Sequence, residues 1–402
     1  MTHANDYAAI WRQVRGLPWC ALVTTGRTGT DFFQSLLDSH PEIFGFNGKL
    51  FFHDFWASSA AANFDGPLNA SDIADEFIGA HIRHFKSRYD TIERKGELGN
   101  NRDQSIDIDS HTFRVHLLGL LEGKSVAPRE FLIAVYVAYA LCLGQDIGRK
   151  KLFLHHQHRI GRLGPFMREF PTSKIICMTR DPRANYVSGV EHWRRFEPMT
   201  DNPSYPLYIL SRAIEEPLQL RAYNPDTVRV VRLEDLGDER TLRAICDWLG
   251  VSYHPCMKES TWAGLRWWGD RLSPNTIRPD ERGFSPTIIA NRWQEKLGHV
   301  DRFLLDYLLG DMLLAYGYVD ARPGGMVAGL IAPFLIPLPT SYERRYLNPG
   351  YLLAAIRGRR LRVFLATFYH PLRRIAYFYR LLLRRWTHRI RFLPMIDART
   401  RS

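Results

Sequence analysis

The feature that most constrains the fold is an alternation, over the first 320 residues, of short apolar β-rich runs with segments of helical periodicity. This alternation is typical of an α/β protein, in which helices connect the parallel strands of one central sheet. We expect strands at residues 18–25, 150–156, 173–180 and 226–236. We expect helices at residues 31–40, 125–144, 159–171, 184–196, 240–250 and 301–318, and helices and loops around a substrate entrance at 45–125.

The positive charge of the chain is concentrated at its C-terminal end. The 402 residues carry a net charge of +12, and residues 341–402 contain 15 arginines, no lysine and two acidic residues. Residues 1–340 are therefore close to neutral, which argues against a nucleic-acid-binding body. We predict a globular domain at 1–320 and an extension at 321–402 that is first apolar and then rich in arginine and aromatic residues.

The composition of this extension predicts a segment that binds at a surface rather than a helix that spans a membrane. Its apolar run at residues 324–339 is short and contains two internal prolines, whereas a spanning helix needs about 20 apolar residues. Further on, helical periodicity separates one arginine-rich face from an apolar one that comprises Ile375, Phe378, Tyr379, Leu382 and Trp386. Arginines beside interfacial aromatics suit an anionic membrane surface. Packing on the domain or on a partner chain is the second interpretation, and nucleic acid is the last.

Neither the cysteines nor the N-terminus indicate secretion. The five cysteines are odd in number, form no C-x-x-C pair and mostly lie in apolar runs, which predicts buried free thiols in a reducing compartment. The N-terminal segment is polar and lacks the apolar core of a signal peptide or membrane anchor. We expect a cytoplasmic protein, peripheral on the inner face of the membrane if the extension binds lipid.

The segment "TGRTGT" directly follows the first expected strand and precedes a helix. Gly26 and Gly29 permit a turn whose backbone amides converge on an anion at the helix N-terminus. Thr28 and Thr30 add hydroxyl donors, and the Arg27 guanidinium can bind two oxygens at once. The lysine of the G-x-x-x-x-G-K-[ST] phosphate loop is absent. The segment predicts an anion site, with a plain glycine turn as the alternative.

A second candidate anion site lies in "RDPRANYVS". Arg180 is expected at the carboxyl end of a central strand, and Ser188 follows eight residues later, about two turns into the next helix. Open α/β sheets bind ligands at the carboxyl ends of their strands, so this pair can clamp a phosphate. A strand-end ion pair between Arg180 and Asp181 is the alternative. Together the two sites predict a ligand with two separated acidic groups.

In these two motifs the chain resembles the sulfotransferases that use 3′-phosphoadenosine 5′-phosphosulfate (PAPS). In that family a loop of the type "GRSGT" holds the 5′-phosphosulfate, and a strand-end arginine with a serine eight residues later holds the 3′-phosphate. The resemblance continues through "VRLEDL", "TLRAICDWLG" and "NRWQEKLG" and covers roughly residues 18–318. It implies a P-loop-like sulfotransferase domain, no metal, and transfer to a hydroxyl of a carbohydrate, glycolipid or small molecule. The donor-binding residues that it implies are Gly26, Arg27, Thr28, Gly29, Thr30, Asp31, Arg180, Ser188, Arg292 and Trp293.

The resemblance also implies in-line attack of an acceptor oxygen on sulfur, with Arg27 stabilising the developing charge. Many relatives carry a glutamate where this chain has Asn47-Gly48, so the general base is left open. Our candidates are His53 and His155, because a histidine can accept a hydroxyl proton near neutral pH. His53 could equally be a packing residue. The histidines of "LFLHHQHR" have no cysteine or carboxylate beside them at the spacing of a zinc site.

Two rival functions remain. A P-loop kinase would use ATP and Mg²⁺, but its lysine is absent. A non-catalytic, membrane-associated nucleotide-binding protein would have lost the general base, and the missing glutamate is the best support for it. Neither the acceptor nor the oligomeric state can be read from the sequence.

Overall fold

A computed structural model describes residues 4–59, 69–124, 126–196, 202–270, 283–285, 293–387 and 391–396. Within these residues the central sheet has five parallel strands in the order β2-β3-β1-β4-β5, which confirms the predicted α/β class. The strands are β1 (Trp19–Thr24), β2 (Ile43–Phe44), β3 (Leu152–Arg159), β4 (Lys174–Thr179) and β5 (Val228–Arg232). A two-stranded antiparallel ribbon, β6 (Thr261–Trp262) and β7 (Leu265–Arg266), lies apart from the sheet in the hydrogen-bond pattern.

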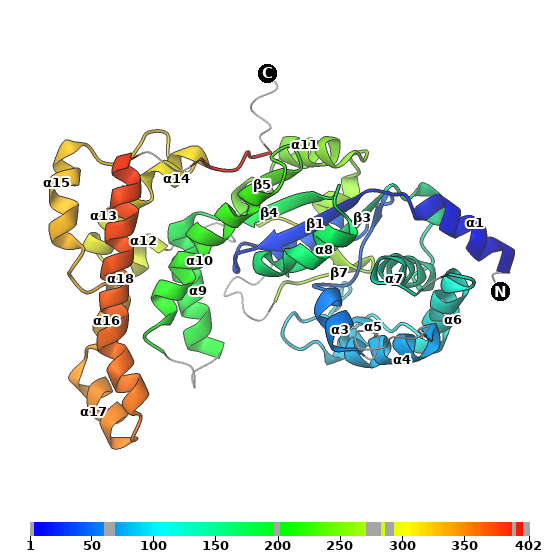
Figure 1. Cartoon of the computed structure of the whole chain (residues 1–402), viewed down its shortest axis with the longest axis horizontal. Helices are drawn as coiled ribbons and strands as arrows, with labels where there is room; N and C mark the ends of the chain where they lie inside the picture. Colours follow the sequence, from blue (N-terminus) through cyan, green and yellow to red (C-terminus); the bar gives the residue numbers. More distant parts are fainter. Residues whose placement is uncertain are drawn as a thin grey trace.

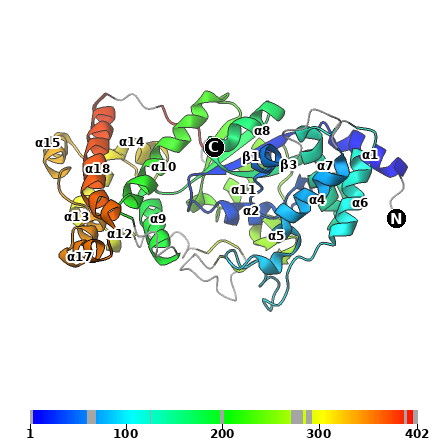
Figure 2. The ribbon, with the colours of Figure 1, turned by 60° about the horizontal axis from the view of Figure 1, so that its bottom comes forward.

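Helices connect the strands and extend the molecule at both ends (Figure 1). The helices are α1 (Ala4–Val14), α2 (Thr30–Leu37), α3 (Phe52–Ser58), α4 (Ala70–Ala80), α5 (Ile82–Phe85), α6 (Ser110–Leu121), α7 (Pro128–Cys142), α8 (Leu163–Glu169), α9 (Pro182–Phe196), α10 (Tyr205–Gln219), α11 (Glu239–Leu249), α12 (Trp293–Lys296), α13 (His299–Leu308), α14 (Gly310–Ala315), α15 (Met326–Leu335), α16 (Ser341–Tyr346), α17 (Pro349–Arg357) and α18 (Leu361–Thr387). Helices α4 to α7 gather at one end and α15, α17 and α18 at the other, in both views (Figure 2).

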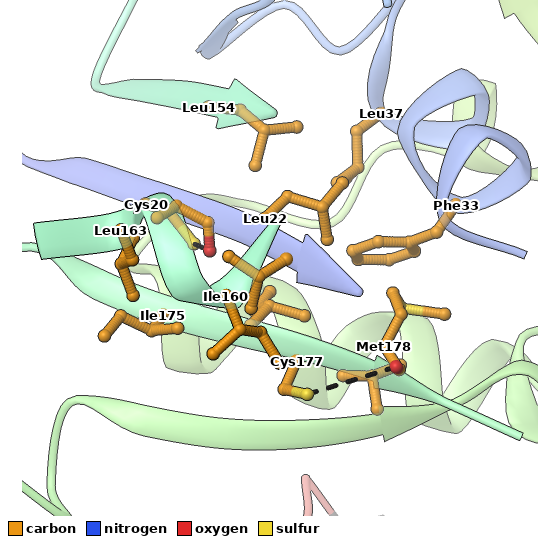
Figure 3. Close-up of a cluster of buried hydrophobic side chains, with 14 of the residues drawn as sticks. Cys20, Leu22, Phe33, Leu37, Leu154, Ile160, Leu163, Ile175, Cys177 and Met178 are labelled. Carbon is orange, nitrogen blue, oxygen red and sulfur yellow. Dashed lines mark hydrogen bonds between the residues drawn. The ribbon is translucent and has the colours of Figure 1, made fainter. Parts of the chain in front are cut away.

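The core lies between the sheet and the helices that follow its strands. β1 is buried along its whole length because both faces of a parallel sheet are covered by helices. Leu22 of β1 and Met178 of β4 cluster with Phe33 and Leu37 of α2 (Figure 3). Close packing of these side chains holds the N-terminus of α2 at the carboxyl end of β1. The five cysteines are free thiols, in agreement with the prediction.

The single helix expected at residues 301–318 is wrong in one respect, because two shorter helices, α13 and α14, occupy this range. The break follows Leu308, and the Arg385 guanidinium of α18 donates to the Tyr307 carbonyl beside it. Gly310 allows this approach, since a Cβ atom there would collide with the same guanidinium. A tertiary contact from the extension therefore lies at the break between α13 and α14.

The extension packs on the rest of the chain. Arg374 of α18 is buried, and its Nε atom lies 3.0 Å from the Glu343 carboxylate of α16. Tyr377, Arg380 and Arg384 of α18 all bond to Glu215 of α10. The described residues near the C-terminus then hydrogen-bond to β5, through Val230, and cover this edge of the sheet. No helix among the described residues is both long enough and apolar enough to cross a bilayer.

Candidate functional site

The "TGRTGT" segment forms a tight turn between β1 and α2. Gly26 has a φ angle of +91° and Gly29 of +76°, in the left-handed region that glycine adopts at little cost. A Cβ atom at Gly29 would also collide with the Leu233 side chain. The backbone amide of Gly26 donates to Thr24 Oγ1 at 2.9 Å, and this oxygen lies 2.5 Å from Thr28 Oγ1. Hydrogen bonds among its own residues thus hold the shape of the turn, which leads into the positive N-terminal end of α2.

A single cavity of about 1090 Å³ brings the two predicted anion sites together. It lies at the carboxyl ends of β1 and β4, where open α/β sheets bind their ligands. The predicted donor-binding residues that line it are Gly26, Arg27, Thr28, Gly29, Thr30, Asp31, Arg180, Ser188 and Trp293. Arg292 lies outside the described residues.

The two anion sites are tied to each other by a hydrogen bond. Asn185 of α9 donates to the Gly26 carbonyl at 2.7 Å, so the helix that carries Ser188 is attached to the turn that carries Arg27. Arg180 follows β4 directly, and burial lowers the pKa of its guanidinium, partly offset by the Glu234 carboxylate. Two cationic groups thus face one cavity at a fixed separation.

Asp181, which the alternative interpretation pairs with Arg180, forms its ion pair with another arginine. Arg183 binds Asp181 at 2.7 Å and Asp306 at 2.7 Å, and its guanidinium lies 4.5 Å from the centre of the Trp293 ring. Arg183 is therefore a structural residue that fixes Trp293 at the wall of the cavity.

The structure places the two predicted base candidates away from the cavity. Neither His53 nor His155 is among the described residues that line it. His155 is fully buried, stacks on Phe166 and bonds to Tyr136 and Gln157. Burial lowers the pKa of His155 to about 3 and of His53 to about 4. Both are packing residues here, which the sequence interpretation considered only for His53.

The histidine that does line the cavity is His158. The expected strand ends at residue 156, but β3 continues to Arg159 through a bulge: Leu22 pairs with His156 and Val23 with His158, which leaves Gln157 unpaired in the register. His158 has a φ angle of +66°, a conformation rarely found for residues other than glycine. Backbone strain of this kind is concentrated at functional sites, so the φ angle makes His158 a candidate functional residue. The sequence interpretation considered this residue only as a zinc ligand.

His158 belongs to a chain of buried polar groups. Its Nδ1 atom lies 3.1 Å from His156 Nε2, and His156 Nδ1 lies 2.7 Å from Gln34 Oε1. Asp31 Oδ1 lies 3.7 Å from His156 Nδ1. Burial, followed by the charge of Glu93, raises the pKa of Asp31 to about 7. Burial, followed by the charge of Lys49, lowers the pKa of His158 to about 3, so its ring is neutral at pH 7.

A carboxylate from a distant segment lies where the resemblance leads us to expect a glutamate. A Cβ atom at Gly48 would be 3.8 Å from Glu93 Oε2 and 2.6 Å from Lys95 Nζ. Glu93 lines the cavity and bonds to Lys95 at 2.7 Å. Burial would raise the pKa of Glu93, but Lys95 and Lys49 hold it at about 2. Sequence reasoning missed Glu93 because residues 45–125 carry no recognisable pattern.

Comparison with known proteins agrees with this geometry. Residues 21–255 match the model of the sulfotransferase family, so the chain belongs to that family, whose enzymes transfer sulfuryl groups. A search of curated proteins finds no match. Among solved structures, the chain is similar to the sulfotransferase domain of the Synechococcus PCC 7002 olefin synthase, at 18% identity over 69% of this chain and 87% of that one, with a TM-score of 0.38. It is also similar to a sulfotransferase domain from the curacin biosynthetic pathway, at 15% identity over 68% and 90%, with a TM-score of 0.38.

Proposed function

We propose that this enzyme transfers the sulfuryl group of PAPS to a hydroxyl of its acceptor. The observation that carries the proposal is the joining of two anion sites, at Arg27 and at Arg180 with Ser188, on one cavity. PAPS has two separated acidic groups, a 5′-phosphosulfate and a 3′-phosphate, and the buried guanidinium and the glycine turn suit them. At about 1090 Å³ the cavity has room for a donor and an acceptor together.

The hydrogen-bond chain assigns the proton positions on both histidines. Gln34 Nε2 donates to the Phe46 carbonyl at 2.7 Å, so its Oε1 atom is the acceptor that faces His156. His156 Nδ1 must therefore carry a proton, and its neutral ring leaves Nε2 to accept from His158 Nδ1. His158 Nε2 then holds a lone pair that can accept a proton, and its position at the cavity, rather than its pKa, distinguishes His158 from His53 and His155.

In the proposed reaction the acceptor oxygen forms a bond to sulfur while the bond from sulfur to the phosphate oxygen breaks. The hydroxyl proton moves to His158 Nε2, and 3′-phosphoadenosine 5′-phosphate leaves. Asp31 is close enough to His156 to stabilise the positive charge that the histidine pair then shares. Arg27 and the turn amides stabilise the negative charge on the leaving phosphate, and this electrostatic term is usually the largest in such reactions.

For the acceptor we propose a hydroxyl of a carbohydrate or glycolipid. The cavity walls away from the turn combine aromatic rings, at Phe51, Tyr208 and Trp267, with the carboxylate of Glu93, whereas the Asp270 carboxylate lies 3.6 Å from Arg27 at the turn itself. Aromatic rings offer flat apolar faces, and carboxylates accept hydrogen bonds from hydroxyl groups. This combination suits a ring that carries several hydroxyls, although a small alcohol would meet the same groups.

The test is a thermal-shift titration of the full chain with 3′-phosphoadenosine 5′-phosphate, and separately with ATP and Mg²⁺. A ligand at 100 times its dissociation constant stabilises the folded state by about 2.7 kcal/mol, which a melting curve resolves. We expect a shift with the bisphosphate alone, and its loss in Arg180→Ala. Stabilisation by ATP instead would favour the kinase, and no stabilisation by either would refute the proposal.

Arg232→Ala is the matched control for this titration. Arg232 ends β5, beside β4, as Arg180 follows β4, but it is buried and bonds to Asp235 and to the carbonyls of Tyr316 and Gly317 rather than lining the cavity. Its loss should lower the melting temperature of the free protein while the ligand-induced shift remains. Turnover with a panel of hydroxylated acceptors then separates an enzyme from a non-catalytic nucleotide-binding protein.

A further inference from the structure

Helix α18 carries an apolar stripe that faces away from the protein. Large apolar residues recur at intervals of three, four or seven positions on its exposed side: Leu361, Leu365, Phe368, Leu372, Tyr379, Leu383 and Trp386. At 100° per residue these positions fall within one narrow sector of the helix. The buried Arg374 and Leu381 lie on the opposite side of the helix. Over 27 residues the stripe is about 40 Å long.

This arrangement corrects the apolar face that the sequence predicts for the extension. Phe378 and Leu382 are buried against the body, whereas Tyr379 and Trp386 point outward. Periodicity alone merged two apolar sectors into one, because it contains no information about which sector the domain covers. Arg380 and Arg384 turn toward Glu215, so the domain also recruits part of the predicted basic face.

Helix α15 enlarges the exposed apolar area. It contains no charged residue, and Met326 is 84% exposed and Phe334 80% exposed. Tyr379 of α18 donates to the Pro333 carbonyl of α15 at 2.9 Å, so the two helices are adjacent at this point. Helix α17 adds exposed Leu353 and Ile356 at the other end of α18 (Figure 1). We call the exposed apolar side chains of α15, α17 and α18 the tail surface.

The charges around the tail surface are of one sign. Arg357, Arg359, Arg360, Arg362 and Arg373 are all exposed on α17, α18 and the turn between them. From residue 321 to residue 396 the sequence has a single acidic residue, Glu343. That carboxylate is buried against Arg374 and is not available to a partner. Two copies that paired through this surface would therefore bring arginine against arginine, without the opposite charges that flank paired helices.

We infer that the tail surface docks on an anionic lipid bilayer, with α18 in the plane of the membrane. An amphipathic helix with an apolar stripe and arginines beside it binds at the boundary between headgroups and acyl chains. Anionic headgroups would balance the arginines that a second copy could not. α10 then lies between the membrane and the cavity, because its Glu215 contacts α18 while its Arg212 and Glu216 line the cavity.

The experiment is co-sedimentation of the full chain with vesicles of phosphatidylcholine alone or mixed with phosphatidylglycerol. We expect binding to the mixed vesicles, little binding to phosphatidylcholine, and release at high salt. Leu365→Glu/Leu372→Glu should lower the partition coefficient at least about tenfold, because burying one leucine is worth more than one decade of binding. Both side chains are exposed, so the fold should persist, as a retained melting transition would verify.

A matched control makes the same charge change at the other end of the molecule. Ile82→Glu/Val115→Glu also replaces two exposed apolar residues, on α5 and α6, and should bind the mixed vesicles like the wild type. Arg357→Gln/Arg373→Gln should weaken binding to the mixed vesicles and reduce its dependence on salt. None of these measurements uses enzyme activity, so they stand independently of the proposed reaction.

Three outcomes would overturn the inference. The first is wild-type protein that stays in solution with the mixed vesicles. The second is a leucine variant that binds them as well as the wild type does. The third is a wild-type dimer in light scattering that the leucine variant converts to a monomer without any vesicle binding, because the tail surface would then pair two copies of the chain.

Discussion

The two sides of the cavity differ in how they are built. On the proposed donor side, the two anion sites come from two short segments, the turn after β1 and the end of β4 with the start of α9, which lie on adjacent strands. On the proposed acceptor side, His158 comes from the end of β3, Glu93 from the irregular segment between α5 and α6, and Trp267 from the segment after β7. Trp267 donates to the Glu93 carbonyl at 2.6 Å, across a sequence separation of 174 residues.

This difference follows from the two chemical tasks that we propose for the two sides of the cavity. Binding a phosphate needs amides at a helix N-terminus and a strand-end cation, which neighbouring residues can supply. Shaping a pocket for a particular acceptor needs side chains from many directions, which only long-range packing can supply. Substitutions on the donor side should therefore change donor affinity and the stabilisation of charge on the leaving phosphate. Substitutions on the acceptor side should change proton transfer and acceptor affinity.

The largest effect is expected at His158. His158→Asn removes the proposed base and should lower kcat by about 10²- to 10⁴-fold, the range for general base catalysis. The thermal shift with 3′-phosphoadenosine 5′-phosphate should remain, because the donor side is intact. His155→Asn is the matched comparison: it should lower stability and leave kcat within a few-fold. Equal loss of kcat in both variants would remove the distinction between the two histidines.

Arg27 should give the next largest effect. Arg27→Ala removes a charge aimed at the leaving phosphate, and kcat should fall by roughly 10²- to 10³-fold, as when one donor to a developing oxyanion is lost. The acceptor KM should change little, because Arg27 belongs to the donor side. Steady-state kinetics with both substrates varied would check this. A large rise in acceptor KM with unchanged kcat would mean that Arg27 binds the acceptor rather than the donor.

For Glu93 we expect a change in acceptor KM rather than in kcat, and a smaller effect than for Arg27. Glu93→Gln removes an acceptor of charge-assisted hydrogen bonds from the cavity wall and should raise the acceptor KM by roughly tenfold. Donor affinity, measured by thermal shift, should be unchanged. If donor affinity falls instead, Glu93 acts through Lys95 and Lys49 on the turn, and the two sides are coupled rather than separate.

The smallest effect concerns stability and pH. The pKa of His155 falls from about 6.5 in an unfolded chain to about 3 when buried, so below pH 6.5 the unfolded state binds a proton that the folded state does not. The free energy of unfolding therefore decreases as the pH falls, by up to about 1.4 kcal/mol per pH unit for this residue. Asp31, with its pKa raised to about 7, acts in the opposite direction.

Denaturant unfolding at several pH values between 5 and 7 would measure this slope. His155→Gln should reduce it, because the substituted residue does not titrate, while the contribution of Asp31 cancels between the two proteins. Equal slopes in the two proteins would mean that His155 is not buried as described.

Much of the fold could be predicted from the sequence because the local preferences of the residues agree with the strands and helices that they form. All four expected strands are present, and β2 is an additional strand of only two residues, too short for any periodicity. The expected helix at 301–318 is interrupted beside a tertiary contact that no local pattern contains, the hydrogen bond from Arg385 to the Tyr307 carbonyl. The boundary between the domain and the extension remains a prediction, although the extension packs on α10 and pairs with β5.

By itself the sequence determined the parallel sheet and the two anion-site motifs, because a glycine turn, a strand-end arginine and a serine two helical turns later are local patterns with fixed spacing. Only the tertiary structure singled out the base that we propose, since a bulge at Gln157 places His158 rather than His155 at the cavity and Gln34, 122 residues from His156, orients the His156 ring. The outward face of α18 was decided in the same way. Periodicity defines the faces of a helix, but only the body on which the helix packs determines which face remains exposed.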